Sequence, residues 1–370
     1  MENSLSALLA DAAASGVAPR LDAAVWIDGD LREASSHQGE RGVFDLASLT
    51  KPLASGLVAL SLAADGSLDL DAPDPQGIAI RRLLDHSAGF ESWRPLFVRC
   101  LEDRIAGSVF AGASGSDARL GFRRGRELMA EVVAAEMPTA PAGAQTRYSD
   151  LGFLRLQRRL EAAAGEPLDL AFHRRVADPL NLGLRFVDLA AGQSLPEALP
   201  TGFFRPRPPA PGQEATAAGL PSTAVGPRPG EVEDDNAFAM GGVAGHAGLF
   251  GTARAVAMAG ACFLQECEGR GRLAPANLAR EFCGPSGPEG RGLGWDRPSG
   301  SWSLGTVLGR GPRGAVGHLG FTGTSLWVDL DRRVAIALCT NRVFHGRENL
   351  MIHDFRPRFH DAVARSLELV

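Results

Sequence analysis

A serine and a lysine three residues apart are the first residues of this sequence whose types could do covalent chemistry. They lie in the stretch Asp45-Leu46-Ala47-Ser48-Leu49-Thr50-Lys51-Pro52. A serine hydroxyl becomes a useful nucleophile only when a neighbouring base accepts its proton, and a lysine can do this. The four-residue pattern also occurs by chance, and a helix-capping serine beside a solvated lysine is its ordinary structural explanation.

Lys51 and Tyr148 are each the only residue of their type in this chain of 370 residues. Every other member of the 38 Lys and Arg residues is an arginine, and 18 Phe residues stand against one Tyr. Lysine and tyrosine can exchange a proton near their own pKa, whereas arginine stays charged and phenylalanine has no such proton. The two single residues therefore point to proton-transfer chemistry.

Length and composition are those of a globular chain with a large core. The 45% hydrophobic and 22% charged residues are average values, and 45 Gly with 24 Pro predict many turns. A net charge of −5 without a long basic run argues against a nucleic-acid partner. The five cysteines contain no C-x-x-C pair, so we expect free thiols and neither a zinc ribbon nor a dithiol redox centre. The sequence as a whole implies no metal and no organic cofactor.

No segment is predicted to enter or cross a membrane. The N-terminal residues lack the basic start and the apolar run of a secretion signal, and no stretch reaches roughly 18 uninterrupted apolar residues. The sequence therefore predicts a cytoplasmic protein without a membrane partner, and it leaves the oligomeric state open.

The elements that must position the serine and the lysine are a strand pair and a helix. Residues 22–27 and 31–35 flank an Asp-Gly turn and predict a β-hairpin. Apolar residues then recur at helical spacing from Ser48 to Ala64. Ser48 would lie at the N-terminus of this helix, and Lys51 would follow one turn later on the same face.

Helical patterns dominate the middle of the chain, and strand patterns dominate its last third. Further helices are predicted over residues 3–15, 78–85, 126–136, 149–164, 168–177, 252–266 and 355–367. Further strands are predicted over residues 292–296, 301–308, 315–319, 325–329 and 334–339. A Pro- and Gly-rich loop at 194–230 would be either a flap over a site or a spacer.

This order predicts an α+β fold, in which an antiparallel sheet is flanked by helices and carries an inserted, mostly helical region. Residues 1–75 and 236–370 are predicted to form the α/β sheet domain, which holds the serine–lysine pair and His318. Residues 76–235 are predicted to form the helical insertion, which holds Tyr148 and the long loop.

Two later motifs change the weight of the serine–lysine pattern. Tyr148-Ser149-Asp150 lies at a loop-to-helix junction, and a predicted strand ends in His318-Leu319-Gly320. Three motifs in this order on suitable elements are far more specific than any one of them. With these motifs and the stretch at 83–90, the chain resembles the serine β-lactamase and penicillin-binding superfamily, closest to its class C-like serine hydrolases, which include esterases and D-aminopeptidases.

The resemblance implies a β-lactamase/transpeptidase-like fold and a role for each motif residue. It makes Ser48 the acylated nucleophile, Lys51 its proton partner and Tyr148 the counterpart of the tyrosine in the family's Tyr-x-Asn motif. His318, Leu319 and Gly320 fall where the family commonly has Lys-Thr-Gly. The backbone N–H groups of Ser48 and Phe321 would form the oxyanion hole.

Two departures from the family pattern affect which substrates the site can recognise. His318 replaces a permanently charged lysine and Leu319 replaces a hydroxyl, while histidine is mostly neutral at pH 7 and leucine donates nothing. Both changes weaken recognition of a substrate carboxylate and disfavour β-lactam turnover. We therefore expect a serine hydrolase that forms an acyl-enzyme with small carboxylic esters. D-amino-acid amides or peptides and β-lactams are the alternative substrates.

Two further functions remain open at this point. An acyltransferase would use the same residues with an alcohol or amine acceptor in place of water. A binding module that keeps the fold without catalysis is the other, although it would have no need of the single lysine and tyrosine.

A third departure generates a test of the general base. Asp150 replaces the usual Asn, and a carboxylate near Lys51 favours the ammonium form, which leaves Tyr148 as the base. We expect Tyr148→Phe to abolish acylation almost completely and Asp150→Asn to retain most of it, as measured by the rate of acyl-enzyme formation. A comparable loss in both variants would contradict this assignment.

Overall fold

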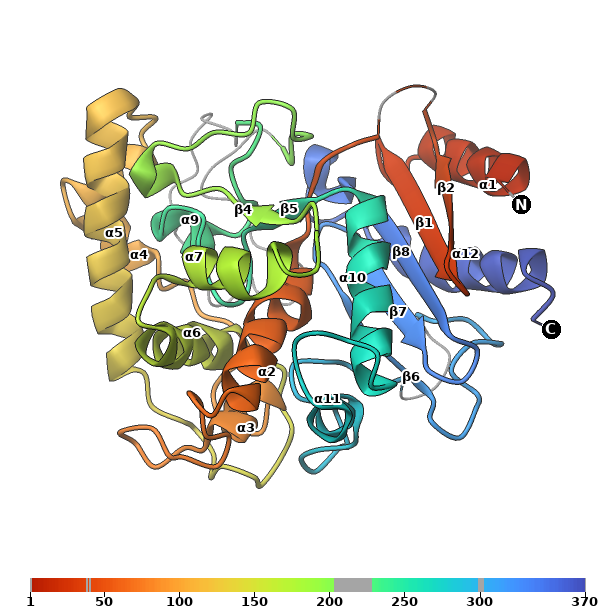
Figure 1. Ribbon diagram of the computed structural model, residues 1–370. Coiled ribbons are helices and arrows are strands. Elements are labelled where there is room, and N and C mark those ends of the chain that lie inside the picture. Colours follow the sequence, from red (N-terminus) through yellow and green to blue (C-terminus); the bar gives the residue numbers. More distant parts are fainter. Residues whose placement is uncertain (1, 38, 40, 203–227, 299–302, 370) are drawn as a thin grey trace.

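The computed structural model describes residues 2–369 except 38, 40, 203–227 and 299–302. One of its sheets has five antiparallel strands (Figure 1). The strands follow the order β2-β1-β8-β7-β6. Their bounds are β1 Leu21–Ile27, β2 Asp30–Ser35, β6 Ala315–Leu319, β7 Ser325–Asp329 and β8 Val334–Thr340. Because β1 pairs with β8, strands from the two ends of the chain are neighbours inside one sheet.

The predicted N-terminal hairpin is confirmed, and its turn explains why it forms. Asp28 and Gly29 have φ angles of 48° and 98°. Two-residue hairpin turns of this type need positive φ at both positions, which Asp and Gly tolerate best. The register pairs Ile27 with Asp30 and continues to Asp22 opposite Ser35.

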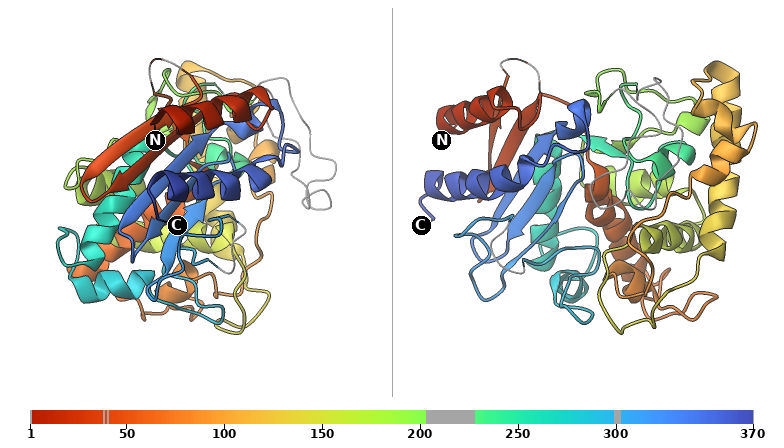
Figure 2. Two further views of the ribbon diagram at one scale, coloured as in Figure 1. Left: turned by 90° about the vertical axis from the view of Figure 1, so that its right-hand side faces the viewer. Right: turned by 180° about the vertical axis from the view of Figure 1, so that it is seen from behind.

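Helices cover both faces of this sheet. One face carries α10 (Ala253–Cys267), and the other carries α1 (Glu2–Ala14) and α12 (Ile352–Ser366), which lie side by side (Figure 2). Gly260 lets α10 approach closely, since a Cβ there would lie 2.8 Å from the Leu326 Cδ1 atom. The predicted α+β sheet flanked by helices is thus confirmed.

A second group of helices packs beside the sheet and shares one continuous hydrophobic core with it. Its members are α2 Leu57–Ala64, α3 Ile80–Leu84, α4 Val98–Glu102, α5 Gly115–Ala135, α6 Asp150–Ala164, α7 Leu168–Phe172, α9 Asp235–Ala239 and α11 Ala276–Cys283. A small sheet of order β3-β5-β4 links distant parts of the chain, with bounds β3 Phe44–Asp45, β4 Arg185–Phe186 and β5 Leu249–Gly251. The sequence analysis missed these three strands because two or three residues are too few to show a period.

The helix predicted from Ser48 to Ala64 is present, but its first turns are irregular. A 3₁₀ turn spans Ala47–Leu49, a π-helical segment spans Lys51–Gly56, and the α-helix α2 begins at Leu57. By length and composition alone Ala47–Ala64 could cross a membrane, yet 78% of it is buried inside the fold, as in a core helix. Irregular turns of this kind often occur at functional sites.

Two predicted strands are wrong. Residues 292–296 form bends with only an isolated bridge from Asp296 to Gly317, and residues 303–308 form turns. Gly294 has a φ of 81°, which breaks an extended strand, and Leu293 and Trp295 are buried in spite of it. Residues 301–302 and most of the long loop, 203–227, lie outside the described residues.

Candidate active site

Ser48 begins its helix on a strained backbone. Ala47 has a φ of 47°, a left-handed conformation that is uncommon for a residue with a side chain. The Asp45 carboxylate accepts the Ala47 N–H at 2.8 Å, and the Thr50 hydroxyl donates to the Ala47 carbonyl at 2.6 Å. The surrounding contacts thus hold an unfavourable turn in place, as is common at sites of function.

The Lys51 ammonium is the centre of the site. Its Nζ atom lies 2.9 Å from Ser48 Oγ, 2.7 Å from Asp150 Oδ1 and 3.3 Å from the carbonyl oxygen of His246. Nζ also lies 4.7 Å from the centre of the Tyr148 ring, and Lys51 and Ser48 are near enough to lower the pKa of the phenol against the effect of burial. The serine, lysine and tyrosine predicted from separate motifs therefore form one connected proton network.

Tyr148 is held in place by the residues on either side of it. Ser149 caps α6, where its hydroxyl accepts the Gly152 N–H at 3.2 Å. His86 Nδ1 accepts the Ser149 N–H at 3.0 Å, and the His86 carbonyl accepts the Arg147 N–H at 2.9 Å. His86 thus fastens the tyrosine segment through its ring and its backbone, a role that the sequence pattern alone does not reveal.

The electrostatics of the network favour protons on both Lys51 and Tyr148. Burial pulls the pKa of Lys51 down, but Asp150 and Tyr148 more than offset it and leave that pKa raised. Burial raises the pKa of Tyr148, and the opposing charge of Lys51 does not cancel the effect. The resting site therefore holds an ammonium and a phenol, and the coupled pair must lose one proton before it can act as a base.

The turn after β6 is fastened directly to the segment before Ser48. Thr322 Oγ1 donates to the Asp45 carbonyl at 2.8 Å, and Thr324 Oγ1 donates to the Leu46 carbonyl at 3.1 Å. A Cβ on Gly320 would lie 2.8 Å from the same Leu46 carbonyl, so only glycine fits. The Phe321 N–H donates to no other group in the described part of the chain, which leaves it available to an oxyanion.

His318 is neutral, and its tautomer follows from one contact. Its Nδ1 atom lies 2.8 Å from the Leu319 carbonyl, which can only accept, so Nδ1 carries the proton. Burial, together with the charges of Lys51 and Arg291, lowers the pKa of His318 well below its ordinary value. The Nε2 lone pair lies 3.8 Å from Asp296 Oδ1 and has no hydrogen-bond partner among the described residues.

A pocket of about 580 Å³ opens over these groups. Its walls include every predicted site residue except the buried Lys51, namely Ser48, Tyr148, Asp150, His318, Leu319, Gly320 and Phe321. The same pocket is lined by side chains that the sequence did not single out for the site, namely Glu233, Asp234, Asp235, His246, Arg342, Arg347 and Arg356. Of these residues, only the acidic run at 233–235 forms a recognisable sequence pattern, since an isolated arginine is not distinctive in an arginine-rich chain.

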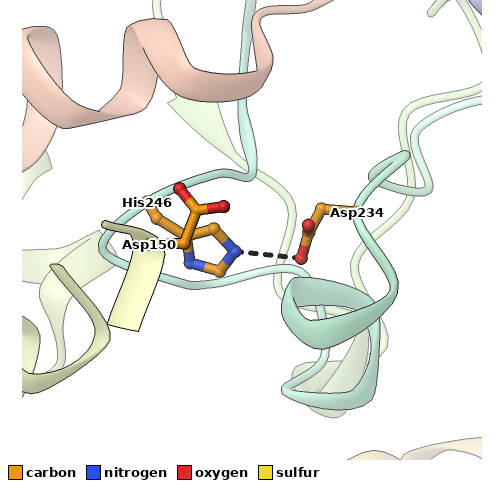
Figure 3. Close-up of side chains that lie close together, drawn as sticks. All are labelled: Asp150, Asp234 and His246. Carbon is orange, nitrogen blue, oxygen red and sulfur yellow. Dashed lines mark hydrogen bonds and ion pairs between the residues drawn. The ribbon is translucent and has the colours of Figure 1, made fainter. Parts of the chain in front are cut away.

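Asp150, Asp234 and His246, three residues of the pocket wall, lie close together (Figure 3), with one ligand atom of each within 4.8 Å of the others. Their atom types suit a metal ion. Lys51 already neutralises Asp150, however, and His246 Nε2 lies 2.9 Å from Asp234 Oδ1. A cation would face the Lys51 ammonium at short range, and we assign no metal to this cluster.

The sheet with its helical partner region and this pocket define the fold of the penicillin-binding and β-lactamase serine hydrolases. The sequence profile described as Beta-lactamase matches residues 2–354, and the chain belongs to that family. The N-acetylmuramyl-L-alanine amidase of Bacillus subtilis (strain 168) is 28% identical over 328 residues, which cover 82% of this chain and 68% of that protein.

Two further proteins are similar to this chain over most of its length. A protein of Escherichia coli O157:H7 named "Putative D-alanyl-D-alanine carboxypeptidase" is 28% identical over 355 residues, covering 86% of this chain and 74% of its own. The solved structure of EstCE1, titled a hydrolase with promiscuous acyltransferase activity, has a TM-score of 0.64. Its identity is 19%, it covers 96% and 98% of the two chains, and it supports the fold alone.

The contact between Asp150 and Lys51 generates a prediction about pH. The Asp150 carboxylate raises the pKa of both Lys51 and Tyr148. Asp150→Asn should therefore lower the pKa of the coupled pair and move the rising limb of kcat/KM against pH to lower pH, by about one unit. A limb that stays in place or moves to higher pH would show that Asp150 does not act on this pair.

Proposed function

We propose that this chain is a serine acyl hydrolase that cleaves amide or ester bonds of small substrates through an acyl-enzyme on Ser48. The observation that carries the proposal is the buried Lys51 ammonium, which lies 2.9 Å from Ser48 Oγ and 4.7 Å from the centre of the Tyr148 ring. A fully buried lysine is costly unless its charge is used or matched, and here it lies against the hydroxyl of Ser48, a residue of the pocket wall.

The geometry supports a two-step acyl transfer. After the Lys51–Tyr148 pair has lost a proton, it accepts the proton of Ser48 while Oγ bonds to the substrate carbonyl carbon. The N–H groups of Ser48 and Phe321 stabilise the oxyanion, and the accepted proton passes to the departing amine or alcohol as the bond to it breaks. Water then adds to the acyl-enzyme and gives a proton to the same pair, which passes it to Ser48 Oγ as the acyl–serine bond breaks and the acid is released.

Two arginines in the pocket wall favour substrates that carry a carboxylate. Arg342 donates to the carbonyls of Phe321 and Asn349 at 2.8 and 2.5 Å. Arg356 donates to the carbonyls of Gly320 and Thr324 at 2.9 Å each. Neither arginine has a carboxylate within ion-pair distance among the described residues, whereas the neighbouring Arg347 pairs with Glu233 at 2.6 Å.

The charge on these two arginines is poorly compensated. Burial and the charge of Arg342 lower the pKa of Arg356 to about 9, and burial lowers that of Arg342 to about 10. A bound substrate carboxylate would stabilise the charged form of both arginines, and charge-assisted hydrogen bonds to it are stronger than neutral ones. We therefore place amides and peptides with a free carboxylate ahead of the plain esters that His318 and Leu319 first suggested. The names of the amidase and carboxypeptidase relatives agree with this order.

Trapping the acyl-enzyme tests the proposed nucleophile. We expect a fluorophosphonate to add its mass to the intact protein on the peptide containing Ser48, and p-nitrophenyl acetate to be hydrolysed. Both signals should disappear in Ser48→Ala. If the wild-type protein neither reacts nor turns over any ester, peptide or chromogenic cephalosporin, the chain is a binding module. Fast cephalosporin turnover alone would make it a β-lactamase.

Matched substrates test the role of the arginines. We expect acetyl-D-alanyl-D-alanine to be cleaved with a kcat/KM about tenfold or more above that of its C-terminal carboxamide. Arg356→Gln should bring this ratio toward one. Arg358→Gln, an exposed change on the same helix, should preserve it. Because each ratio is measured within one variant, partial unfolding cannot produce the result. Equal rates on the two substrates in the wild type would refute carboxylate recognition.

A further inference from the structure

The surroundings of Tyr148 contain a charge pair that the proposed mechanism has not used. Arg291 places its guanidinium carbon 5.7 Å from the centre of the Tyr148 ring. Its nearest carboxylate is Asp296, with which it forms an ion pair, and the Asp296 oxygen in turn lies 3.8 Å from His318 Nε2. The pair therefore bridges the two ring side chains on the β6 side of the site.

The neutrality of His318 makes this pair important. A permanently charged residue at position 318 would help a tyrosine near it to release its proton, since a nearby cation stabilises the phenolate. His318 cannot do this, because burial keeps its ring uncharged and its Nδ1 proton points to the Leu319 carbonyl. Arg291 is partly buried, stays charged at neutral pH and lies against the Tyr148 ring.

The loop that carries the pair is well anchored. Ser286 donates its hydroxyl to Asp85 at 2.8 Å, and Arg297 donates to the Cys283 carbonyl at 2.5 Å. The Asp296 N–H donates to the Gly317 carbonyl at 2.8 Å, next to His318 on β6. Contacts at both ends and on the sheet thus fix the position of the guanidinium relative to the tyrosine, as preorganised electrostatics requires.

We propose that Arg291 is a positioning residue that stabilises the deprotonated form of Tyr148, and that Asp296 moderates its charge. The proposal rests on the proposed function, in which the Lys51–Tyr148 pair accepts the proton of Ser48. The other titratable groups that face Tyr148 are Lys51 and Asp150 on one side, and His86 and His318, both of which burial keeps neutral, on the other. Arg291 also feels the charges of Glu289 and Asp85.

Because Arg291 and Asp296 carry opposite charges, removing one or the other should move the pH dependence of activity in opposite directions. The pH dependence of kcat/KM is measured for Ser48-dependent hydrolysis of p-nitrophenyl acetate. Arg291→Gln removes a positive charge near the phenol and should move the rising limb to higher pH by about one unit. Asp296→Asn leaves the guanidinium unpaired and should move the limb to lower pH. Arg291→Lys keeps the charge and should restore most of the wild-type position.

The directions of these pH shifts distinguish an electrostatic role of Arg291 and Asp296 from a purely structural role. Loss of loop structure lowers the plateau rate but does not move the limb in opposite directions for two partners of one ion pair. Arg313→Gln, which removes an exposed arginine paired with Asp331 at 3.2 Å, should leave the profile unchanged. If the rising limb of kcat/KM lies at the same pH in the wild type, Arg291→Gln and Asp296→Asn, the inference is overturned. An inactive wild type would instead refute the proposed function.

Discussion

The buried ammonium of Lys51 is the constraint on which the rest of the site depends. Taking a lysine charge out of water costs several kcal/mol unless partners replace the lost hydration. Its partners are the Ser48 hydroxyl, the Tyr148 phenol, the Asp150 carboxylate and the His246 carbonyl, which come from three separate stretches of the chain. The ammonium is therefore satisfied only when α6 and the glycine-rich segment before β5 are docked against the first helix. Correct assembly of the helical region and a competent site are thus the same event.

A second set of contacts ties the sheet to this assembly. Two threonine hydroxyls in the β6–β7 turn bind the carbonyls of Asp45 and Leu46, and Arg356 on α12 holds the carbonyls at Gly320 and Thr324 from the other side. The turn is therefore fixed between the nucleophile segment and the last helix. Since an oxyanion donor works only at a defined distance, a turn held from both sides is what an N–H group such as that of Phe321 requires.

The sequence predicted what local pattern and residue type can encode. It correctly predicted the hairpin and the grouping of Ser48, Lys51 and Tyr148. It also predicted the sheet strands at 315–319, 325–329 and 334–339. It missed β3, β4 and β5, which exist only because distant segments pair, and it wrongly extended strand character into 292–296. Asp234, Arg342 and Arg356 were out of reach for a similar reason, because tertiary folding alone brings them to the pocket.

His318 alone does not decide how much positive charge the site presents. The ring is neutral, as its type suggested, and it does not supply the cation of the family's lysine. Positive charge lies instead on other elements, with Arg291 beside the tyrosine and Arg342 and Arg356 against the turn after β6. A lysine at 318 could serve both the base and a substrate carboxylate with one charge. Separate arginines divide these tasks, so that each can be altered without the other, and arginine holds its charge even where burial lowers its pKa.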